Sequence, residues 1–256
     1  MPWRWIPPIT APGATQMAID RWLLDQLEAG GPPCLRLYRW STPTLSLGRH
    51  QQRLEPHWPA LVEQGRITLV RRPSGGRAVL HAADLTYALV CRPAGTQRQR
   101  AYRDSCQWLQ HAFAEAGQPL QWGGGPGAGH FAEAHGRSSC FATATGADLI
   151  HANGAKRIGS AQLWRGGLLL QHGSLLLDPP VALWRDVFGA PPPSLDPLPW
   201  GDDALEVQLR RSAERWLCGG PLVEQPLSPA EWRQIEAYSP LASMALATDA
   251  SPMPRG

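Results

Sequence analysis

Two glycine-containing turns divide residues 147–177 into three runs that resemble β-strands. Asn153-Gly154 and Gly166-Gly167 are typical of tight hairpin turns, because such residues tolerate the positive φ angles that these turns require. They separate the runs ADLIHA, AKRIGSAQLWR and LLLQHGSLLL. The sequence therefore predicts a three-stranded β-meander, and the chain must adopt a fold that contains such strands.

Further strands and helices precede and follow this meander. Alternating or continuous apolar runs predict strands at CLRLYRW, LSLG, ITLVR, AVLH and DLTYALVC. Apolar residues at helical spacing predict helices near 15–29, 102–116 and 203–217, and Ser228 and Glu231 form a capping box that starts another. Strands interspersed with peripheral helices indicate the α/β (α+β) class.

Length, charge and cysteine content restrict the function. The chain has 256 residues, which we interpret as one domain, and it contains no apolar run long enough for a membrane span or a signal peptide. We therefore expect a cytoplasmic protein. Its five cysteines form no CxxC pair, so we expect free thiols rather than disulfides or a metal cluster. The formal charge of +3 permits acidic partners but gives no nucleic-acid signature.

Lys156 is the only lysine of the chain, against 23 arginines. The abundance of Arg, Ala, Pro and Gly indicates a GC-rich coding bias, so a single remaining lysine can be chance. The alternative is that position 156 requires an amine, because an amine can lose its proton or act as a compact charge and a guanidinium cannot.

The middle strand of the predicted meander contains Lys156 near its start. A period of two places Lys156 on one face with Ile158, Ser160 and Gln162. Gly159 and Ala161 leave little bulk on the other face, so a ligand can approach the backbone there. In the third strand, His172 is either an ordinary buried imidazole or a residue that lines a site.

Two glycine-rich segments have alternative interpretations. RRPSGGRAVLH at 71–81 is either a tight turn between strands or a loop whose backbone N–H groups, with Arg71, Arg72 and Arg77, bind an anionic or carbonyl-bearing ligand. It is not a Walker loop, because the GK[ST] signature is missing. GGGPGAG at 123–129 is either a linker or a lid over a site.

Several motifs in order resemble the biotin/lipoate protein ligase and lipoyl/octanoyl transferase superfamily. They are MAIDRWLL, LRLYRWSTPTLSLGRHQ, RRPSGGRAVLH with DLTYALV, SCF, KRIGSAQ and QHGSLLL. The resemblance implies a mixed β-sheet flanked by helices, with an acyl group in a tunnel under the glycine loop and the lysine at its mouth. It implies a single catalytic domain over 1–243, with a motif-bearing core at 14–178 and a helical part at 181–243. We expect residues 244–256 to be disordered.

The details of these motifs are most similar to the cysteine-dependent octanoyltransferases. ATP-using lipoate ligases typically contain GGGxVxHD, whereas Arg77 and Ala82 occupy the third-glycine and Asp positions here. The resemblance implies that Cys140 is the nucleophile and that Lys156 lies beside it. It also implies a set of substrate-binding residues: Arg72, Ser74, Gly75, Gly76, Arg77, His81, Gly159, Ser160 and His172.

The implied reaction is the transfer of an octanoyl or lipoyl group from acyl carrier protein to a lysine of a lipoyl-domain protein. The donor is a thioester, so no cofactor or metal is expected, and we expect a monomer with no nucleic-acid or membrane partner. A thiolate reacts and a thiol does not, so Lys156 either supplies a positive charge or accepts the proton of Cys140. The alternatives are an ATP- and Mg-dependent lipoate–protein ligase and a non-catalytic protein that binds acyl groups or their carrier.

Overall fold

A large mixed sheet forms the centre of the protein. The structure is a computed structural model, described here for residues 1–95, 97–124, 138–146 and 148–239. The sheet has eight strands in the order β11 (Val223–Glu224), β1 (Arg4–Ala11), β2 (Cys34–Trp40), β6 (Asp84–Cys91), β10 (Leu168–Leu176), β9 (Lys156–Arg165), β8 (Leu149–Ile150) and β7 (Gln121–Trp122). β1 is parallel to both of its neighbours and the other pairs are antiparallel. A smaller sheet has the order β4 (Thr68–Arg71), β3 (Thr44–Leu47) and β5 (Val79–His81).

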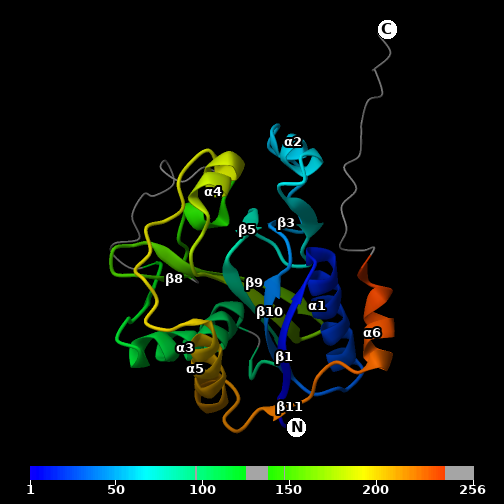
Figure 1. The fold of residues 1–256 in the computed structure, drawn as a ribbon. Helices are drawn as coiled ribbons and strands as arrows, with labels where there is room; N and C mark the ends of the chain where they lie inside the picture. Colours follow the sequence, from blue (N-terminus) through cyan, green and yellow to red (C-terminus); the bar gives the residue numbers. More distant parts are fainter. Residues whose placement is uncertain (96, 125–137, 147, 240–256) are drawn as a thin grey trace.

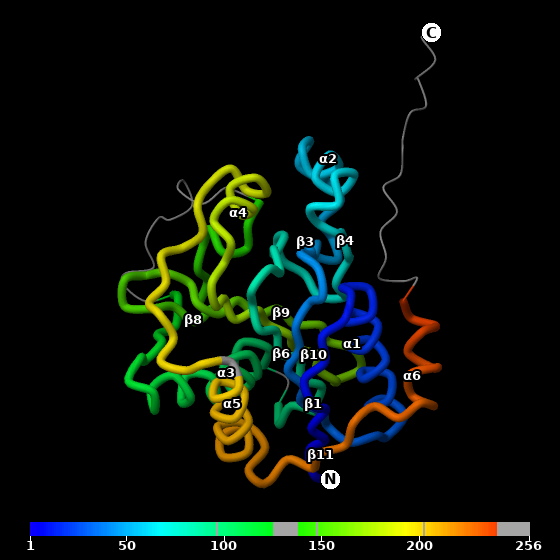
Figure 2. Tube along the Cα trace, in the orientation of Figure 1, coloured from blue at the N-terminus to red at the C-terminus, as the bar shows by residue number. Residues whose placement is uncertain are grey.

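Helices cover both faces of the large sheet. They are α1 (Gly13–Glu28), α2 (Trp58–Glu63), α3 (Arg98–Glu115), α4 (Val181–Phe188), α5 (Asp202–Trp216) and α6 (Pro229–Glu236). Figures 1 and 2 show α1 and α6 on one side and α3 and α5 on the other, with α2 and α4 beyond the small sheet. The apolar clusters confirm this arrangement. Trp22 of α1 packs with Leu170 of β10, whereas Phe113 of α3 packs with Leu169, which points to the opposite face of the same strand. The predicted class, α/β (α+β) with a mixed sheet flanked by helices, is confirmed.

The predicted meander is present as β8, β9 and β10. Gly166 and Gly167 join β9 to β10 with φ angles of +54° and +80°, as a two-residue hairpin requires. Asn153-Gly154 also lies in a turn, but this connection runs from 151 to 155, so β8 is shorter than the run ADLIHA. The predicted capping box is confirmed as well, since Ser228 and Glu231 exchange hydrogen bonds at the start of α6.

Two predictions concern segments that lie wholly or partly outside the described residues. The tail at 244–256, which we expect to be disordered, lies outside the described residues, as does the 125–129 part of the GGGPGAG segment. Within the described ranges, we find no helix long and apolar enough to cross a membrane.

Candidate active site

Cys140 lies beside the end of the glycine loop. It begins a short 3-10 turn, η2 (Cys140–Ala142), and its backbone N–H donates to the carbonyl of Ala78 at 2.8 Å. The Ser139 hydroxyl caps this turn by accepting from the N–H of Phe141. The backbone therefore fixes the cysteine against the segment that follows Gly75 and Gly76.

The other four cysteines are in unreactive surroundings. Burial raises the thiol pKa of Cys34, Cys91 and Cys218 to about 12 and that of Cys106 to about 11. A thiol with such a pKa contains almost no thiolate at neutral pH. Cys140, in contrast, is half-buried and has an ammonium next to its sulfur.

Lys156 supplies that ammonium. Its Nζ lies 2.9 Å from the carbonyl oxygen of Cys140, 3.6 Å from the Cys140 sulfur and 2.9 Å from Oδ1 of Asp148. Burial lowers the pKa of Lys156, but the charges of Cys140 and Asp148 and their hydrogen bonds raise it more, so the net pKa is above its ordinary value. Lys156 is therefore positively charged at neutral pH, and its ammonium lies next to the Cys140 sulfur.

The prediction that Lys156 shares a face with Ile158, Ser160 and Gln162 is wrong. Leu149 pairs with Ile158 whereas the next residue, Ile150, pairs with Lys156, so β9 contains one extra residue at this point. This bulge turns Lys156 to the opposite face, over Gly159, where a Cβ would lie 2.7 Å from the lysine Cε. A simple period of two fails wherever a strand bulges.

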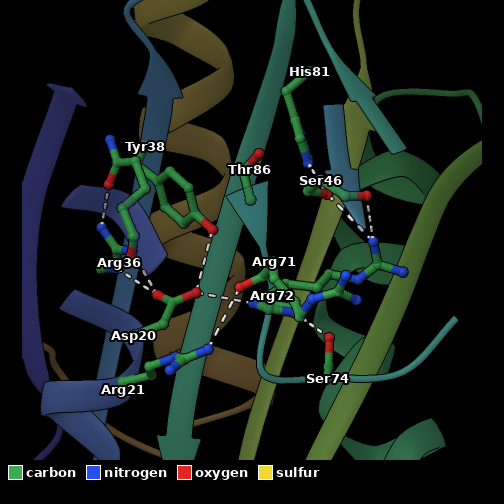
Figure 3. Close-up of polar contacts among 12 residues, drawn as sticks. Asp20, Arg21, Arg36, Tyr38, Ser46, Arg71, Arg72, Ser74, His81 and Thr86 are labelled. Carbon is green, nitrogen blue, oxygen red and sulfur yellow. Dashed lines mark hydrogen bonds and ion pairs between the residues drawn. The ribbon is translucent and has the colours of Figure 1, made fainter. Parts of the chain in front are cut away.

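Arg72 holds the glycine loop in place. Its side chain is buried, and its guanidinium donates to the carbonyl oxygens of Ser46 at 2.7 Å, Gly75 at 2.8 Å and Arg77 at 2.6 Å. Figure 3 shows Arg72 reaching Ser46 of β3 above the loop. The guanidinium is thus engaged by the loop backbone, which indicates a role in loop shape rather than direct contact with an anion.

The two other arginines of this segment also bond to the protein. Arg71 donates to the carbonyls of Gly48 at 2.9 Å and Gln51 at 2.7 Å, and Arg77 donates to the Thr143 hydroxyl at 2.7 Å. Arg77 thereby connects the glycine loop to the residues that follow Cys140. The anion-binding interpretation assumed that the three arginines converge on one ligand pocket. Their contacts show that they do not.

Gly76 is the glycine that the loop conformation requires. Its φ is +96° and a Cβ would lie 2.8 Å from Nη2 of Arg72, whereas Gly75 has an ordinary φ and no atom within 4 Å of a Cβ. We expect Gly76→Ala to lower the free energy of unfolding by about 1–3 kcal/mol, and Gly75→Ala to change it by less than about 0.5 kcal/mol. Urea unfolding of both variants tests this, and equal effects would contradict it.

Two buried histidines connect serines of the loop region to aspartates. His172 of β10 contacts the Ser74 hydroxyl through Nε2 at 2.5 Å and Asp20 of α1 through Nδ1 at 2.9 Å. Asp20 also accepts from Arg36 and Tyr38, as Figure 3 shows. His172 therefore combines both interpretations of the sequence, because its imidazole has satisfied partners and also lines a cavity.

His81 makes the matching contacts from β5. It hydrogen-bonds the Ser46 hydroxyl through Nε2 at 2.9 Å and Asp84 through Nδ1 at 2.8 Å, and its ring stacks on Trp40. Burial lowers the pKa of His81 more than Asp84 raises it. His81 is therefore neutral at pH 7 and donates its Nδ1 proton to the carboxylate.

One cavity joins most of the predicted residues. It is lined by Cys140, the loop residues Arg72 and Gly76, both histidines, Gly159, Ser160 and Ala161, with Met17, Tyr38 and Trp40 from α1 and β2. Ser74, Gly75, Arg77 and Lys156 do not line it, although Lys156 touches Cys140. Ser160 lines the cavity, but its hydroxyl bonds to Tyr87 at 2.7 Å on the α3 side of the sheet.

The sheet floor of this cavity is a row of residues that crosses four strands. Gly159 pairs with Ser174, Ser174 with Thr86, and Thr86 with Tyr38. Three interstrand spacings give about 14 Å from the β9 end, beside Cys140, to the β2 end. The cavity is therefore elongated across the strands and has the cysteine near one end.

Comparison with known proteins identifies the family. The family model for the lipoyl protein ligase A/B catalytic domain matches residues 12–194. The chain belongs to this family. Within it, octanoyltransferase LipM of Moorella thermoacetica is 40% identical over 181 residues, which cover 68% of this chain and 65% of the relative. That of Symbiobacterium thermophilum is 38% identical over 187 residues, covering 71% and 67%, so the match spans about two thirds of either relative.

Solved structures of the family share the fold. Lipoate-protein ligase A bound with ATP has a TM-score of 0.73 at 18% identity, covering 94% of this chain and 95% of that one. A Thermoplasma acidophilum lipoate protein ligase, studied with its E2 lipoyl domain, has the same TM-score and identity, covering 94% and 92%. These similarities cover nearly the whole chain and show a shared fold.

Sequence reasoning missed the acidic residues of the site. Asp148 contacts Lys156, Asp20 contacts His172 and Asp84 contacts His81. A signal was present in the sequence, because a carboxylate inside an apolar helix or strand is rarely buried unless it is paired. The pairing partners come from distant segments, so the sequence alone does not identify them.

Proposed function

We propose that the chain transfers an octanoyl group from acyl carrier protein to a lysine of a lipoyl-domain protein, through a thioester on Cys140. The observation that carries this proposal is the contact of Lys156 with both the sulfur and the carbonyl of Cys140, at one end of the elongated cavity. The LipM relatives, which are named octanoyltransferases, support the same reaction.

In the first half-reaction, the Cys140 thiolate attacks the carbonyl carbon of the donor thioester. The bond to the carrier sulfur breaks, and that sulfur leaves as a thiolate that takes up a proton. One thioester replaces another, so this exchange is nearly neutral in energy and no nucleotide is needed. Lys156, whose Nζ lies 3.6 Å from the Cys140 sulfur, stabilises the thiolate before the attack.

In the second half-reaction, the amine of the acceptor lysine attacks the thioester carbon on Cys140. The carbon–sulfur bond breaks, an amide forms, and the attacking nitrogen loses a proton to solvent. The Cys140 thiolate is regenerated beside the Lys156 ammonium, which restores the starting state. Covalent catalysis of this kind divides one slow transfer into two easier steps.

The length of the cavity suits an acyl chain of this size. An extended chain advances about 1.2 Å per bond, so the eight bonds from a sulfur through eight carbons span about 10 Å. This length fits within the ~14 Å row between the β9 and β2 ends, with the remaining space taken up by the side chains of the far wall. The buried Met17 and Tyr38 form part of that wall.

We expect octanoyl transfer to proceed without ATP or Mg. Purified protein is mixed with octanoyl carrier protein and a lipoyl domain, and the mass of the lipoyl domain is followed with and without nucleotide. A gain of one octanoyl group at equal rates supports the transferase. A gain that requires ATP indicates the ligase reaction instead, and no gain under either condition indicates a protein that only binds acyl groups.

A further inference from the structure

Asp148 is a buried carboxylate that connects the two candidate catalytic residues. It lies one residue before β8, and its side chain and that of Lys156 are 4% and 3% exposed. Oδ1 contacts Nζ of Lys156 at 2.9 Å, while Oδ2 accepts from the backbone N–H of Thr145 at 2.7 Å and from its hydroxyl at 2.9 Å. Both oxygens are thus used, and the carboxylate has a fixed orientation.

The Lys156 ammonium has as many partners as it has protons. Its three donors meet the three acceptors Asp148 Oδ1, the Cys140 carbonyl and the Cys140 sulfur. Asp148 is the only one of these that is anchored independently of the cysteine, through Thr145 on the segment between η2 and β8. A flexible lysine side chain placed on a bulged strand needs such an anchor to keep one position.

We propose that Asp148 is a positioning residue that holds the Lys156 ammonium, protonated, against the sulfur and carbonyl of Cys140. This inference rests on the proposed function for its catalytic meaning, although the Asp148–Lys156 contact itself does not. Without the carboxylate, the amine remains buried with the cysteine as its only charged partner, and burial favours its neutral form. The thiolate then loses its fixed counter-charge.

Other charged or titratable groups face this cluster from neighbouring elements. Arg72 of the glycine loop interacts electrostatically with Cys140, and Tyr102 and Cys106 of α3 interact with Asp148. Burial raises the pKa of Tyr102 well above its ordinary value and that of Cys106 to about 11, so both are neutral over the physiological range. Asp148 is therefore the acidic side chain that contacts the lysine directly.

The single lysine of the chain allows a direct test. Protein labelled with [ε-13C]lysine, with no lysine in its tag, gives one side-chain NMR signal, which belongs to Lys156. We expect this signal to titrate above the ordinary lysine value of about 10.4 in the unmodified protein. In Asp148→Asn, which keeps the shape but removes the charge, the midpoint should fall below that of the unmodified protein.

Two further variants separate positioning from folding. Thr145→Val removes one hydrogen bond to Asp148 without touching the ion pair, and it should shift the midpoint in the same direction by a smaller amount. Glu231→Gln is the matched control, because it removes the carboxylate of the Arg4–Glu231 ion pair far along the chain. It should leave the Lys156 titration unchanged even though it weakens the fold.

The catalytic consequence is measured separately. Acylation of Cys140 by octanoyl carrier protein should be about 10²-fold slower in folded Asp148→Asn, the effect expected when a reacting group is displaced by about 1 Å. An unchanged Lys156 midpoint, or an unchanged acylation rate, would overturn the proposal. If the unmodified protein itself accepts no octanoyl group, the proposed function fails, while the NMR titration still decides whether Asp148 holds Lys156.

Discussion

Replacing Cys140 by alanine should reduce octanoyl transfer by about 10⁴-fold or more, because loss of a covalent nucleophile disables both half-reactions. The substitution removes one sulfur atom from a half-buried position, and the backbone hydrogen bond from residue 140 to Ala78 is kept. Folding should therefore be preserved. The measurement is the rate of octanoyl transfer to a lipoyl domain, with circular dichroism as the check on structure.

Cys218→Ala is the matched control for this experiment. Cys218 is also half-buried, but burial raises its thiol pKa to about 12, and it lies two residues after the end of α5. We expect full activity from this variant. Substantial activity in Cys140→Ala, or loss in Cys218→Ala alone, would assign the nucleophile to another residue.

Replacing Lys156 by arginine should slow both half-reactions by about 10²- to 10³-fold, the loss typical of a displaced electrostatic stabiliser, although the formal charge is unchanged. The ammonium fits between Gly159 and the Phe141 ring, whose centroid lies 5.1 Å from Nζ. An arginine fork is larger than this site, so a guanidinium cannot place its charge where the ammonium lies beside the sulfur. If the lysine were only a remnant of coding bias, the substitution would be nearly silent.

Single-turnover measurements separate the two half-reactions in Lys156→Arg. Acylation is followed by the mass gain of the enzyme, and deacylation by the mass gain of the lipoyl domain. A variant that keeps more than half of the unmodified rate in both steps would show that position 156 needs only a positive charge. Lys156→Met, which keeps the length without the charge, should lose at least as much activity as the arginine variant.

The ion pair at Lys156 also predicts how stability depends on pH. The pKa of Lys156 is higher in the folded protein than in the unfolded chain, because Cys140 and Asp148 favour the charged form more than burial disfavours it. The resulting stabilisation is fully present below the unfolded value of about 10.4 and is lost as the pH rises through the folded pKa. Denaturant unfolding at neutral and strongly alkaline pH tests this prediction, because the contribution of Lys156 to the free energy of unfolding should be lost at the alkaline pH.

Most strands and helices could be predicted because local patterns encode them. The strands around the glycine loop and the meander alternate or run apolar between turn residues, and the structure has them where expected. β1 was missed because Pro7 and Pro8 lie inside it, and proline is rare in strands. The structure accommodates both at a register shift between Ile6 and Ile9, where regular pairing with β2 is interrupted.

The centre of the site could be predicted only in part. The motifs that resemble the superfamily identified Cys140 and Lys156, and the structure places them in contact. The face of β9 on which Lys156 lies was not predictable, because the bulge in β9 depends on its pairing with β8 and not on the residues of β9 alone. The anchoring by Asp148 likewise arises from the turn that Thr145 closes, which no local pattern reveals.

The arginines show that a sequence motif alone does not distinguish a ligand-binding role from a structural one. Three cations around two glycines indicate an anion site, yet Arg72 donates to carbonyls of the loop and Arg71 to those of Gly48 and Gln51. Each guanidinium has several donors, and backbone carbonyls of a tight loop can satisfy them as well as a ligand can. Their contacts favour a structural contribution to the cavity.

The central claim is that Cys140 carries the acyl group, and intact-mass spectrometry tests it most directly. The protein is incubated with octanoyl carrier protein in the absence of nucleotide and acceptor, quenched in acid and digested for peptide mapping. We predict a mass gain of one octanoyl group, located on the peptide that contains Cys140 and removed by hydroxylamine. An unmodified enzyme, or a label on any other residue, would contradict the account.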